Sequence, residues 1–370
     1  MSSRQRLIIL GSSLTALAVA RDAHALGMEP VVVDFQPGLA FRSRRVRPIV
    51  APQGLSGPEL ANALSASGSA RDYVIATSDA WLEQVVVHRK TLDGAGCVVL
   101  HPSDSALETC LDKSKFGTWC VSQGLPSPRS WLAGKEPRPS GLVPPLLVRP
   151  ASTLHAAAGD GPKLPKAIEV TSEAELDRWL VAFAEQRRAA IVSESLLHEP
   201  LLQFSVPFVR TPNGLQAFVA RKVRPAARHC SVGSYVELTS QPEVEGLARR
   251  AADALDYFGI GEAEILRVES TGRLFLIEIN ARPWLQYALA LASGYDFLGT
   301  LVGSPRPTRP LASGRRWIDL ESDLYAAFSS STGAVRLGEL GLGAYLASLL
   351  RANVYARFDL WDPMPALRRS

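Results

Sequence analysis

Short apolar runs alternate with amphipathic segments over the first hundred residues. Four of these runs are bounded by polar or turn residues, which predicts buried strands at 7–10, 31–34, 73–77 and 97–100. The segment 13–26 has the character of a helix that Gly27 ends, and Ser78 is placed to cap a second helix. Strands alternating with helices predict a doubly wound α/β domain with a parallel sheet.

The pattern changes after residue 106. One helix is expected from Leu107 to Cys120, and Gly124 ends it. Further strands are expected at 146–149, 168–170 and 191–194, with a capping box at 172–175 opening a helix. A strand-rich stretch, a helix at 242–258 and a hairpin follow residue 200, and two short helices are expected after residue 305. The second half therefore predicts α+β architecture.

Composition narrows the class of protein. With 370 residues, 46% of them hydrophobic, and a net charge of +4, the chain is too long for one core and too apolar to be disordered. No apolar run reaches the roughly 18 residues of a membrane span, and the N-terminus lacks the pattern of an export signal, so we expect a cytoplasmic protein. The four cysteines and six histidines form no paired motif, and the arginines lack interleaved aromatic residues. These features argue against a disulfide framework, a zinc centre and nucleic-acid binding.

The strongest candidate for chemistry is the hairpin at 261–280. Two alternating runs flank the turn 270–272, and centring that turn on Thr271 places Glu264 opposite Glu278 and Glu262 opposite Asn280. Facing like charges destabilise a sheet. Two carboxylates and an amide oxygen form a ligand set that suits Mg²⁺ held jointly with substrate phosphates.

A second interpretation needs no metal. A neighbouring arginine, at 267, 273 or 282, would neutralise the two carboxylates on a solvated face of the sheet. Arg282 itself follows the second strand directly, where a guanidinium is suited to bind phosphate or carboxylate with two hydrogen bonds. The hairpin alone leaves both interpretations open.

Motifs along nearly the whole chain resemble the ATP-grasp superfamily. Residues 278–283, Glu-Ile-Asn-Ala-Arg-Pro, look like its E-x-N-x-R-P signature, and residues 111–116 and 124–128 resemble its D-K helix and G-x-P-x-P segment. Residues 147–150 and 192–194 match two further strands of that family. Residues 220–224, Ala-Arg-Lys-Val-Arg, resemble a strand of the carboxylate–amine ligase subgroup that includes D-aspartate ligase, and segments 77–79, 256–259 and 362–365 also fit that subgroup.

This resemblance implies a domain plan and an activity. An N-terminal pre-ATP-grasp domain would cover residues 1–106, the ATP-grasp domain residues 107–304, and a C-terminal extension residues 305–370. The nucleotide would lie between a lobe at 107–192 and a lobe at 193–304. ATP would phosphorylate a small carboxylate, and an amine, such as an amino acid or peptide, would attack the acyl phosphate to form an amide with release of ADP and phosphate. A homodimer is one assembly compatible with the resemblance.

The resemblance also assigns roles to single residues. Mg²⁺ or Mn²⁺ would bind to Glu264, Glu278 and Asn280; the α- and β-phosphates would bind to Lys113 and Arg149; and the γ-phosphate would bind to Lys222. The adenine amino group would be read by Glu194, and the transferred phosphoryl group or the substrate carboxylate would be held by Arg282. The loop 152–166 would close over the phosphates.

Several positions depart from the family pattern. Arg149 replaces the usual lysine, and Lys115 competes with Lys113 for the phosphate role. The ribose partner is open between Glu199 and Gln203. The acyl phosphate could also be captured by a nucleophile other than an amine, and a module that binds ATP without turnover is a further alternative, which the change at position 149 favours.

Two weaker signals lie outside these motifs. Gly11-Ser12-Ser13 after the first strand suggests a dinucleotide fold, but the glycine fingerprint is incomplete. The segment 229–234 is a candidate acceptor loop, with an ordinary polar connection as the alternative. Its Cys230 has no neighbouring base in sequence and is not expected to be a nucleophile.

Overall fold

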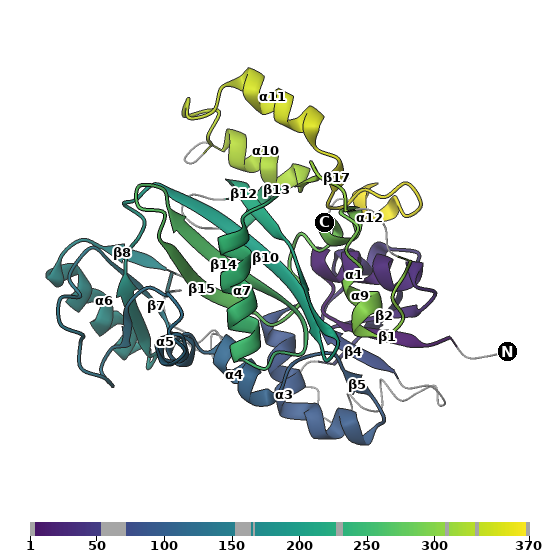
Figure 1. Cartoon of the computed structure of the whole chain (residues 1–370), viewed down its shortest axis with the longest axis horizontal. Helices are drawn as coiled ribbons and strands as arrows, with labels where there is room; N and C mark the ends of the chain where they lie inside the picture. Colours follow the sequence, from purple (N-terminus) through teal and green to yellow (C-terminus); the bar gives the residue numbers. More distant parts are fainter. Residues whose placement is uncertain are drawn as a thin grey trace.

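The computed structural model describes residues 4–52, 72–151, 164–165, 167–226, 232–307, 311–329 and 333–367 (Figure 1). Over these residues the strands form three sheets. Most of the expected lid loop at 152–166 and half of the expected acceptor loop at 229–234, including Cys230, lie outside the described residues.

The first sheet has five parallel strands in the order β3-β2-β1-β4-β5. Its strands and principal helices are β1 (Arg6–Leu10), α1 (Leu14–Ala25), β2 (Glu29–Asp34), β3 (Arg47–Val50), β4 (Tyr73–Ala76), α3 (Asp79–Gly94) and β5 (Val98–Val99). The side chains of β1 are fully buried because helices cover both faces of a parallel sheet. The doubly wound arrangement expected from the sequence is confirmed.

Asp34, the last residue of β2, forms hydrogen bonds with the segment after β1 and with neighbouring residues of this domain. Its carboxylate accepts hydrogen bonds from the backbone and hydroxyl of Ser12, at 2.7 and 2.6 Å, from the amide of Phe35 at 2.8 Å, and from the indole of Trp81 at 3.2 Å. The Phe35 and Trp81 rings stack 4.5 Å apart. Asp34 therefore organises the carboxyl ends of the strands.

The second sheet has four strands in the order β6-β9-β7-β8, all antiparallel. These are β6 (Ser130–Leu132), β7 (Leu146–Pro150), β8 (Ile168–Val170) and β9 (Ala190–Glu194), with α6 (Glu173–Glu185) packed against them. Leu176 and Phe183 of α6 are buried against Leu146 and Val148. This small α+β lobe has its own core.

The single helix expected between Leu107 and Cys120 is wrong. The structure has two helices, α4 (Asp104–Leu111) and α5 (Lys113–Ser122), with a break at Asp112. The Asp112 carboxylate accepts hydrogen bonds from the amides of Ser114 and Lys115, at 2.8 and 3.2 Å, so it caps α5. The break makes Lys113 the first residue of a new helix.

The third sheet has eight strands and is the largest. Its main path runs β15-β14-β10-β12-β13-β16-β17, and β11 pairs with β10. The strands are β10 (Leu201–Thr211), β11 (Gly214–Ala217), β12 (Val219–Pro225), β13 (Gly233–Thr239), β14 (Gly259–Val268), β15 (Leu274–Asn280), β16 (Arg316–Ile318) and β17 (Val354–Tyr355). Helix α7 (Pro242–Ala254) covers one face (Figure 1).

The predicted hairpin register is confirmed at the carboxylates and the amide that are the candidate metal ligands. Glu264 lies opposite Glu278, and Glu262 lies opposite Asn280. Nearer the turn the expected register is wrong, because a β-bulge pairs Ile265 with Leu276. The amide of Leu276 donates instead to the carbonyl of Pro126, at 2.7 Å, which ties the bulge to the segment after α5.

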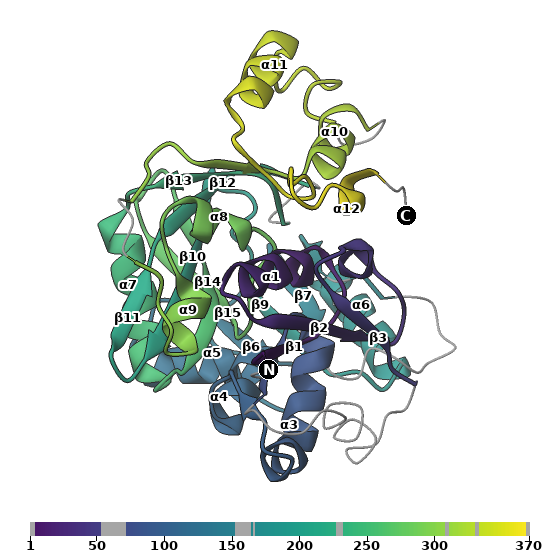
Figure 2. The same ribbon diagram turned by 90° about the vertical axis from the view of Figure 1, so that its right-hand side faces the viewer.

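The last part of the chain contains α10 (Leu320–Phe328), α11 (Leu342–Arg351) and α12 (Met364–Leu367), together with two strands that the sequence did not predict, β16 and β17. Helices α10 and α11 project from the body (Figure 2). Most of the exposed large apolar side chains of the described residues lie between Leu320 and Leu367. Within the described part of the chain, no helix has the length and apolar character to cross a membrane. The domain boundaries expected from the sequence stay a prediction.

Candidate active site

A cleft of about 850 Å³ lies between the four-stranded and eight-stranded sheets. Its walls come from α5, β7 and β9 on one side and from β10, β12, β14 and β15 on the other. The residues predicted from the sequence that line it are Lys113, Arg149, Glu194, Lys222, Glu264 and Glu278. Six of the eight predicted site residues are therefore brought together in one cavity.

Two carboxylates face each other on the floor of the cleft. Glu264 and Glu278 are direct cross-strand partners on β14 and β15. Burial raises the pKa of Glu264 to about 7, with Lys222 acting in the opposite direction. Burial also opposes ionisation of Glu278, but Lys113, Arg149 and Lys222 together lower its pKa. One site therefore holds two closely placed acids with different proton affinities.

Two lysines balance these acids. The Lys222 ammonium, on β12, lies 2.8 Å from the Glu264 carboxylate, and only 4% of the Lys222 side chain is exposed. The Lys113 ammonium, on α5, lies 3.4 Å from the Glu278 carboxylate. Lys115 instead pairs with Glu108 at 2.8 Å on the exposed surface of its helix. Of the two lysines that competed for the phosphate role, only Lys113 lines the described cleft.

Arg149 at the end of β7 has an unusual environment. Its Nε is buried and has no hydrogen-bond partner among the described residues. Burial lowers the pKa of Arg149, and the charge of Glu278 opposes that shift. A buried guanidinium nitrogen without a partner is costly, because it has lost its water without gaining an acceptor. Such a group is suited to bind an anionic ligand.

Glu194 ends β9 at the connection between the two sheets. One oxygen of its carboxylate accepts a hydrogen bond from the Arg129 amide at 2.9 Å, and the other lies 3.5 Å from the Arg129 guanidinium. Apolar side chains also line the cleft, among them Leu147, Ile191, Leu196, Leu266 and Leu276. These side chains were not predicted as site residues, because in the sequence they are indistinguishable from core positions.

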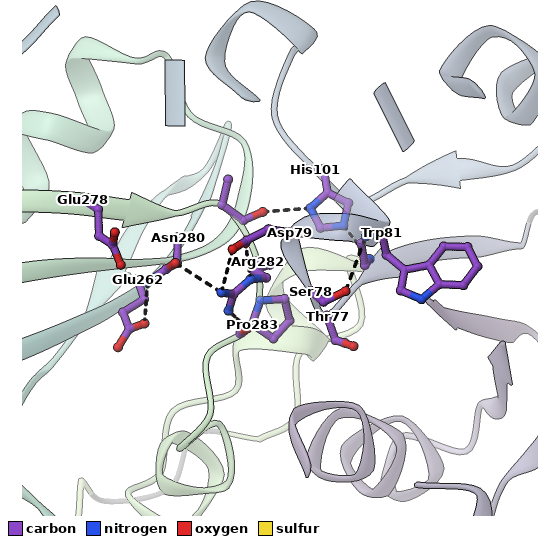
Figure 3. A network of polar contacts seen from close by, with 12 residues as sticks. Thr77, Ser78, Asp79, Trp81, His101, Glu262, Glu278, Asn280, Arg282 and Pro283 are labelled. Carbon is purple, nitrogen blue, oxygen red and sulfur yellow. Dashed lines mark hydrogen bonds and ion pairs between the residues drawn. The ribbon is translucent and has the colours of Figure 1, made fainter. Parts of the chain in front are cut away.

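Asn280 and Arg282 do not line the cleft but lie beside it in one polar network (Figure 3). The Asn280 amide donates to the Glu262 carboxylate at 3.1 Å, and the Asn280 oxygen accepts from Arg282 at 3.3 Å. Glu262 is buried and also accepts a hydrogen bond from Ser205. These contacts hold the end of β15 in place.

The network contains two residues whose contacts the sequence analysis missed. Asp79 entered the sequence analysis only within the segment 77–79, yet its carboxylate lies 2.6 Å from Arg282, across 203 positions of the chain. His101 is buried between the first sheet and the end of β15. No signal in a single sequence pairs residues this distant.

The cleft offers oxygen ligands for a metal ion. Over the described residues, no group of three or more His, Cys, Asp or Glu side chains is arranged to hold a metal by itself. Glu264 and Glu278 provide two carboxylates, and the Asn280 oxygen lies on the same side of the strand two residues further on. Mg²⁺ commonly binds one or two carboxylates and completes its shell with water and substrate phosphates. The residues therefore fit a Mg²⁺ ion held jointly with a phosphate ligand.

Comparison with known proteins gives matches at the level of structure. No family model and no curated protein matches the sequence. N5-carboxyaminoimidazole ribonucleotide synthetase from Thermus thermophilus matches with a TM-score of 0.63 at 19% identity, over 82% of this chain and 80% of that chain. N5-carboxyaminoimidazole synthetase from Staphylococcus aureus, complexed with ADP, gives a TM-score of 0.65 at 13% identity, over 84% and 80% of the two chains.

A third structure is a β-γ-ATP complex of biotin carboxylase from Campylobacter jejuni, with a TM-score of 0.63 at 15% identity, over 84% of this chain and 74% of that chain. The chain has an ATP-grasp fold. This fold was predicted from the motif order, and it is confirmed over most of the chain. In the ATP-grasp fold of this chain, the cleft between the two lobes is the one that Lys113, Arg149 and the carboxylate pair line.

Proposed function

We propose that the protein is an ATP- and Mg²⁺-dependent ligase that joins a carboxylate to an amine through an acyl phosphate. The observation that carries the proposal is the convergence of three cations and two carboxylates, Lys113, Arg149, Lys222, Glu264 and Glu278, on one cleft with apolar walls. The cations would bind the phosphates once the carboxylates hold Mg²⁺, and the apolar walls suit a nucleobase. Structures of the same fold, determined with ADP and with β-γ-ATP, support a nucleotide ligand.

In the first step an oxygen of the substrate carboxylate attacks the γ-phosphorus of ATP. The bond from that phosphorus to the β–γ bridging oxygen breaks, and ADP leaves. The residues then need only to align the reactants and balance charge. Lys222 would contact the γ-phosphate and Lys113 and Arg149 the α- and β-phosphates, while Glu194 would receive the adenine amino group.

In the second step the amine nitrogen attacks the carbonyl carbon of the acyl phosphate. The carbon–oxygen bond to phosphate breaks, phosphate leaves, and the nitrogen loses a proton to give the amide. Arg282 would hold the phosphoryl group or the carboxylate during this exchange, since its planar fork binds oxyanions with two hydrogen bonds.

Glu264, Glu278 and Asn280 would hold the Mg²⁺ ion. When bound, the ion would screen the negative charge of the phosphates. The carboxylates then contribute to catalysis only as ligands, and Lys113 and Lys222 would shift their contacts from the carboxylates towards the phosphates. A change of Glu278 to glutamine preserves shape and removes the ligand charge.

Trapping the intermediate with hydroxylamine tests the proposal before either substrate is known. The protein is incubated with Mg·ATP, pooled small carboxylic acids and hydroxylamine, and the hydroxamates, ADP and AMP are separated by chromatography. We expect ADP and a hydroxamate in equal amounts, both dependent on one acid pool. AMP in place of ADP would overturn the acyl-phosphate mechanism, and tight ATP binding without any product from any pool would favour the module that binds ATP without turnover.

A matched pair of variants controls the assay. Glu278→Gln should reduce hydroxamate formation by at least about 100-fold, since it removes a charged ligand in the transition state. Glu269→Gln changes an exposed carboxylate at the turn of the same hairpin and should keep activity within about twofold of the unmodified protein. Full activity in Glu278→Gln would contradict the metal assignment.

A further inference from the structure

Arg282 is held by residues outside its own sheet. Its Nε donates to one oxygen of the Asp79 carboxylate at 2.6 Å, and one Nη lies 3.4 Å from the other oxygen (Figure 3). The same Nη lies 3.3 Å from the Asn280 oxygen. The remaining Nη contacts only a carbonyl, that of Pro283, at 3.4 Å in the described structure. One edge of the guanidinium is thus fixed, and the other is left for a ligand.

Asp79 is itself fixed by its position in the fold. It is the first residue of α3, and the preceding Ser78 caps the helix by accepting a hydrogen bond from the amide of Trp81. A carboxylate in the first turn is favoured by the helix dipole. The helix follows β4, the strand that pairs with β1 at the centre of the first sheet. Asp79 therefore presents a charge from the rigid first sheet to the end of β15.

His101 fixes the backbone next to Arg282. Its Nε2 lies 2.7 Å from the amide nitrogen of Ala76, which can only donate, so Nε2 accepts. Its Nδ1 lies 3.1 Å from the carbonyl of Ala281, which can only accept, so Nδ1 carries the proton. The neutral imidazole thereby joins β4 of the first sheet to the residue before Arg282 (Figure 3).

A third contact brings the same two regions together. Gly259, the first residue of β14, has φ +114°, and a Cβ atom placed there would lie 2.9 Å from the carbonyl oxygen of Leu100. A backbone approach this close requires glycine. The chain segment from Leu100 to His101 is thus packed directly against the start of the hairpin that carries the carboxylates.

We propose that Asp79 and His101 are positioning residues, through which the first sheet sets the place and orientation of Arg282 for an anionic substrate. The proposal rests on the proposed function, which gives Arg282 its ligand. Asp79 aligns one edge of the Arg282 guanidinium, and His101 holds the carbonyl of Ala281, the residue before Arg282. The substrate oxyanion then binds to the free Nη edge of Arg282.

Kinetics of Asp79→Asn and His101→Gln test this role. We expect each variant to lower kcat/KM for the carboxylate by about 10- to 100-fold, as misplacement of a binding group does. The dissociation constant of Mg·ATP should stay within twofold, because neither residue lines the nucleotide cleft. The double variant should lose less than the product of the two single losses, since both residues act through Arg282.

Asp104→Asn is the matched control. Asp104, the first residue of α4, forms an ion pair with Arg89 of α3 at 2.5 Å but contacts no site residue, so its change should leave kcat/KM within twofold. A loss of ATP binding in Asp79→Asn as large as its loss in kcat/KM would assign Asp79 a merely structural role and overturn the proposal. Unchanged kcat/KM in Asp79→Asn would overturn it as well.

Chemical protection separates this proposal from the proposed function. The rate at which phenylglyoxal modifies Arg282 is followed by mass spectrometry of its peptide, without substrate or turnover. Asp79→Asn and His101→Gln should each raise that rate at least about fivefold, while Asp104→Asn should not. Equal rates in all four proteins would overturn the proposal even if the ligase activity is found. If His101→Gln does not fold, Asp79→Asn decides the result alone, because Asp79 is partly exposed.

Discussion

The two arginines beside the cleft differ in what surrounds them. Arg282 shares its guanidinium among Asp79, Asn280 and the Pro283 carbonyl. Arg149, on the opposite lobe, has a buried Nε with no described partner. The first is held in place by the protein, whereas the second retains unused capacity to bind a ligand. One side of the site is therefore preorganised by the fold, and the other is completed by its ligand.

Replacing each arginine with methionine should affect ligand binding and stability in opposite ways. Arg149→Met should raise the dissociation constant of Mg·ATP by about 10- to 100-fold, since a charged hydrogen bond to a ligand contributes about 1.5–3 kcal/mol. Its free energy of unfolding should not fall, because no described hydrogen bond of its Nε is lost and a costly buried group is removed. Isothermal titration and urea unfolding measure the two quantities.

Arg282→Met should show the opposite pattern. ATP affinity should stay within about threefold, while the unfolding free energy should fall by about 1 kcal/mol, because Asp79 and Asn280 lose a partner. If Arg282→Met weakens ATP binding more than Arg149→Met, the division between the two sides of the site is wrong.

The two lysines of α5 should differ in their contribution to nucleotide binding. Lys113→Met should weaken Mg·ATP binding by about tenfold, because Lys113 lines the cleft and contacts Glu278. Lys115→Met should change it by less than twofold, since the Lys115–Glu108 pair is exposed and lies outside the cleft. The same titration compares the two variants. Equal losses of Mg·ATP affinity would show that the two lysines act only through their overall positive charge and not through a specific contact of Lys113.

The pH dependence of stability gives the smallest expected effect and concerns the preorganised side. Burial lowers the pKa of His101 to about 3. Between about pH 6.5 and 3 the unfolded chain binds a proton that the folded protein excludes, so stability falls as the pH falls. Relative to His101→Gln, the unmodified protein should lose about 1 kcal/mol of unfolding free energy between pH 7 and 5.5. Urea unfolding at the two pH values checks this prediction. Equal losses of unfolding free energy in the unmodified protein and in His101→Gln would contradict a neutral His101 between Ala76 and Ala281.

Local patterns predicted much of this structure. Alternation in the hairpin placed Glu264 and Glu278 on one face of the ribbon correctly. The register nearer the turn was wrong by one residue, and the bulge at Ile265 and Leu276 restores the expected pairing at Glu264. The bulge was missed, since the Leu276 amide bonds there to Pro126, about 150 positions away in the chain. The break at Asp112 was missed although the residue is a common N-cap, because the apolar pattern continues through it.

The site was predictable to the extent that it lies in motifs. Lys113, Arg149 and Lys222 come from three separate segments, and the motif order alone grouped them. The contacts of Asp79 and His101 arise only when the first sheet packs against the hairpin, so no local pattern reveals them. Strands β16 and β17 were missed for a similar reason, because they are three and two residues long and form only at the edge of a large sheet.

The most direct test of this account is titration of the unmodified protein with Mg·ATP, repeated without magnesium and with Arg149→Met. The account predicts saturable binding at one site per chain that weakens when magnesium is omitted and weakens by about tenfold or more in the variant. Absence of ATP binding to the unmodified protein, or binding that Arg149→Met leaves unchanged, would contradict the assignment of the cleft between the two lobes as a nucleotide site.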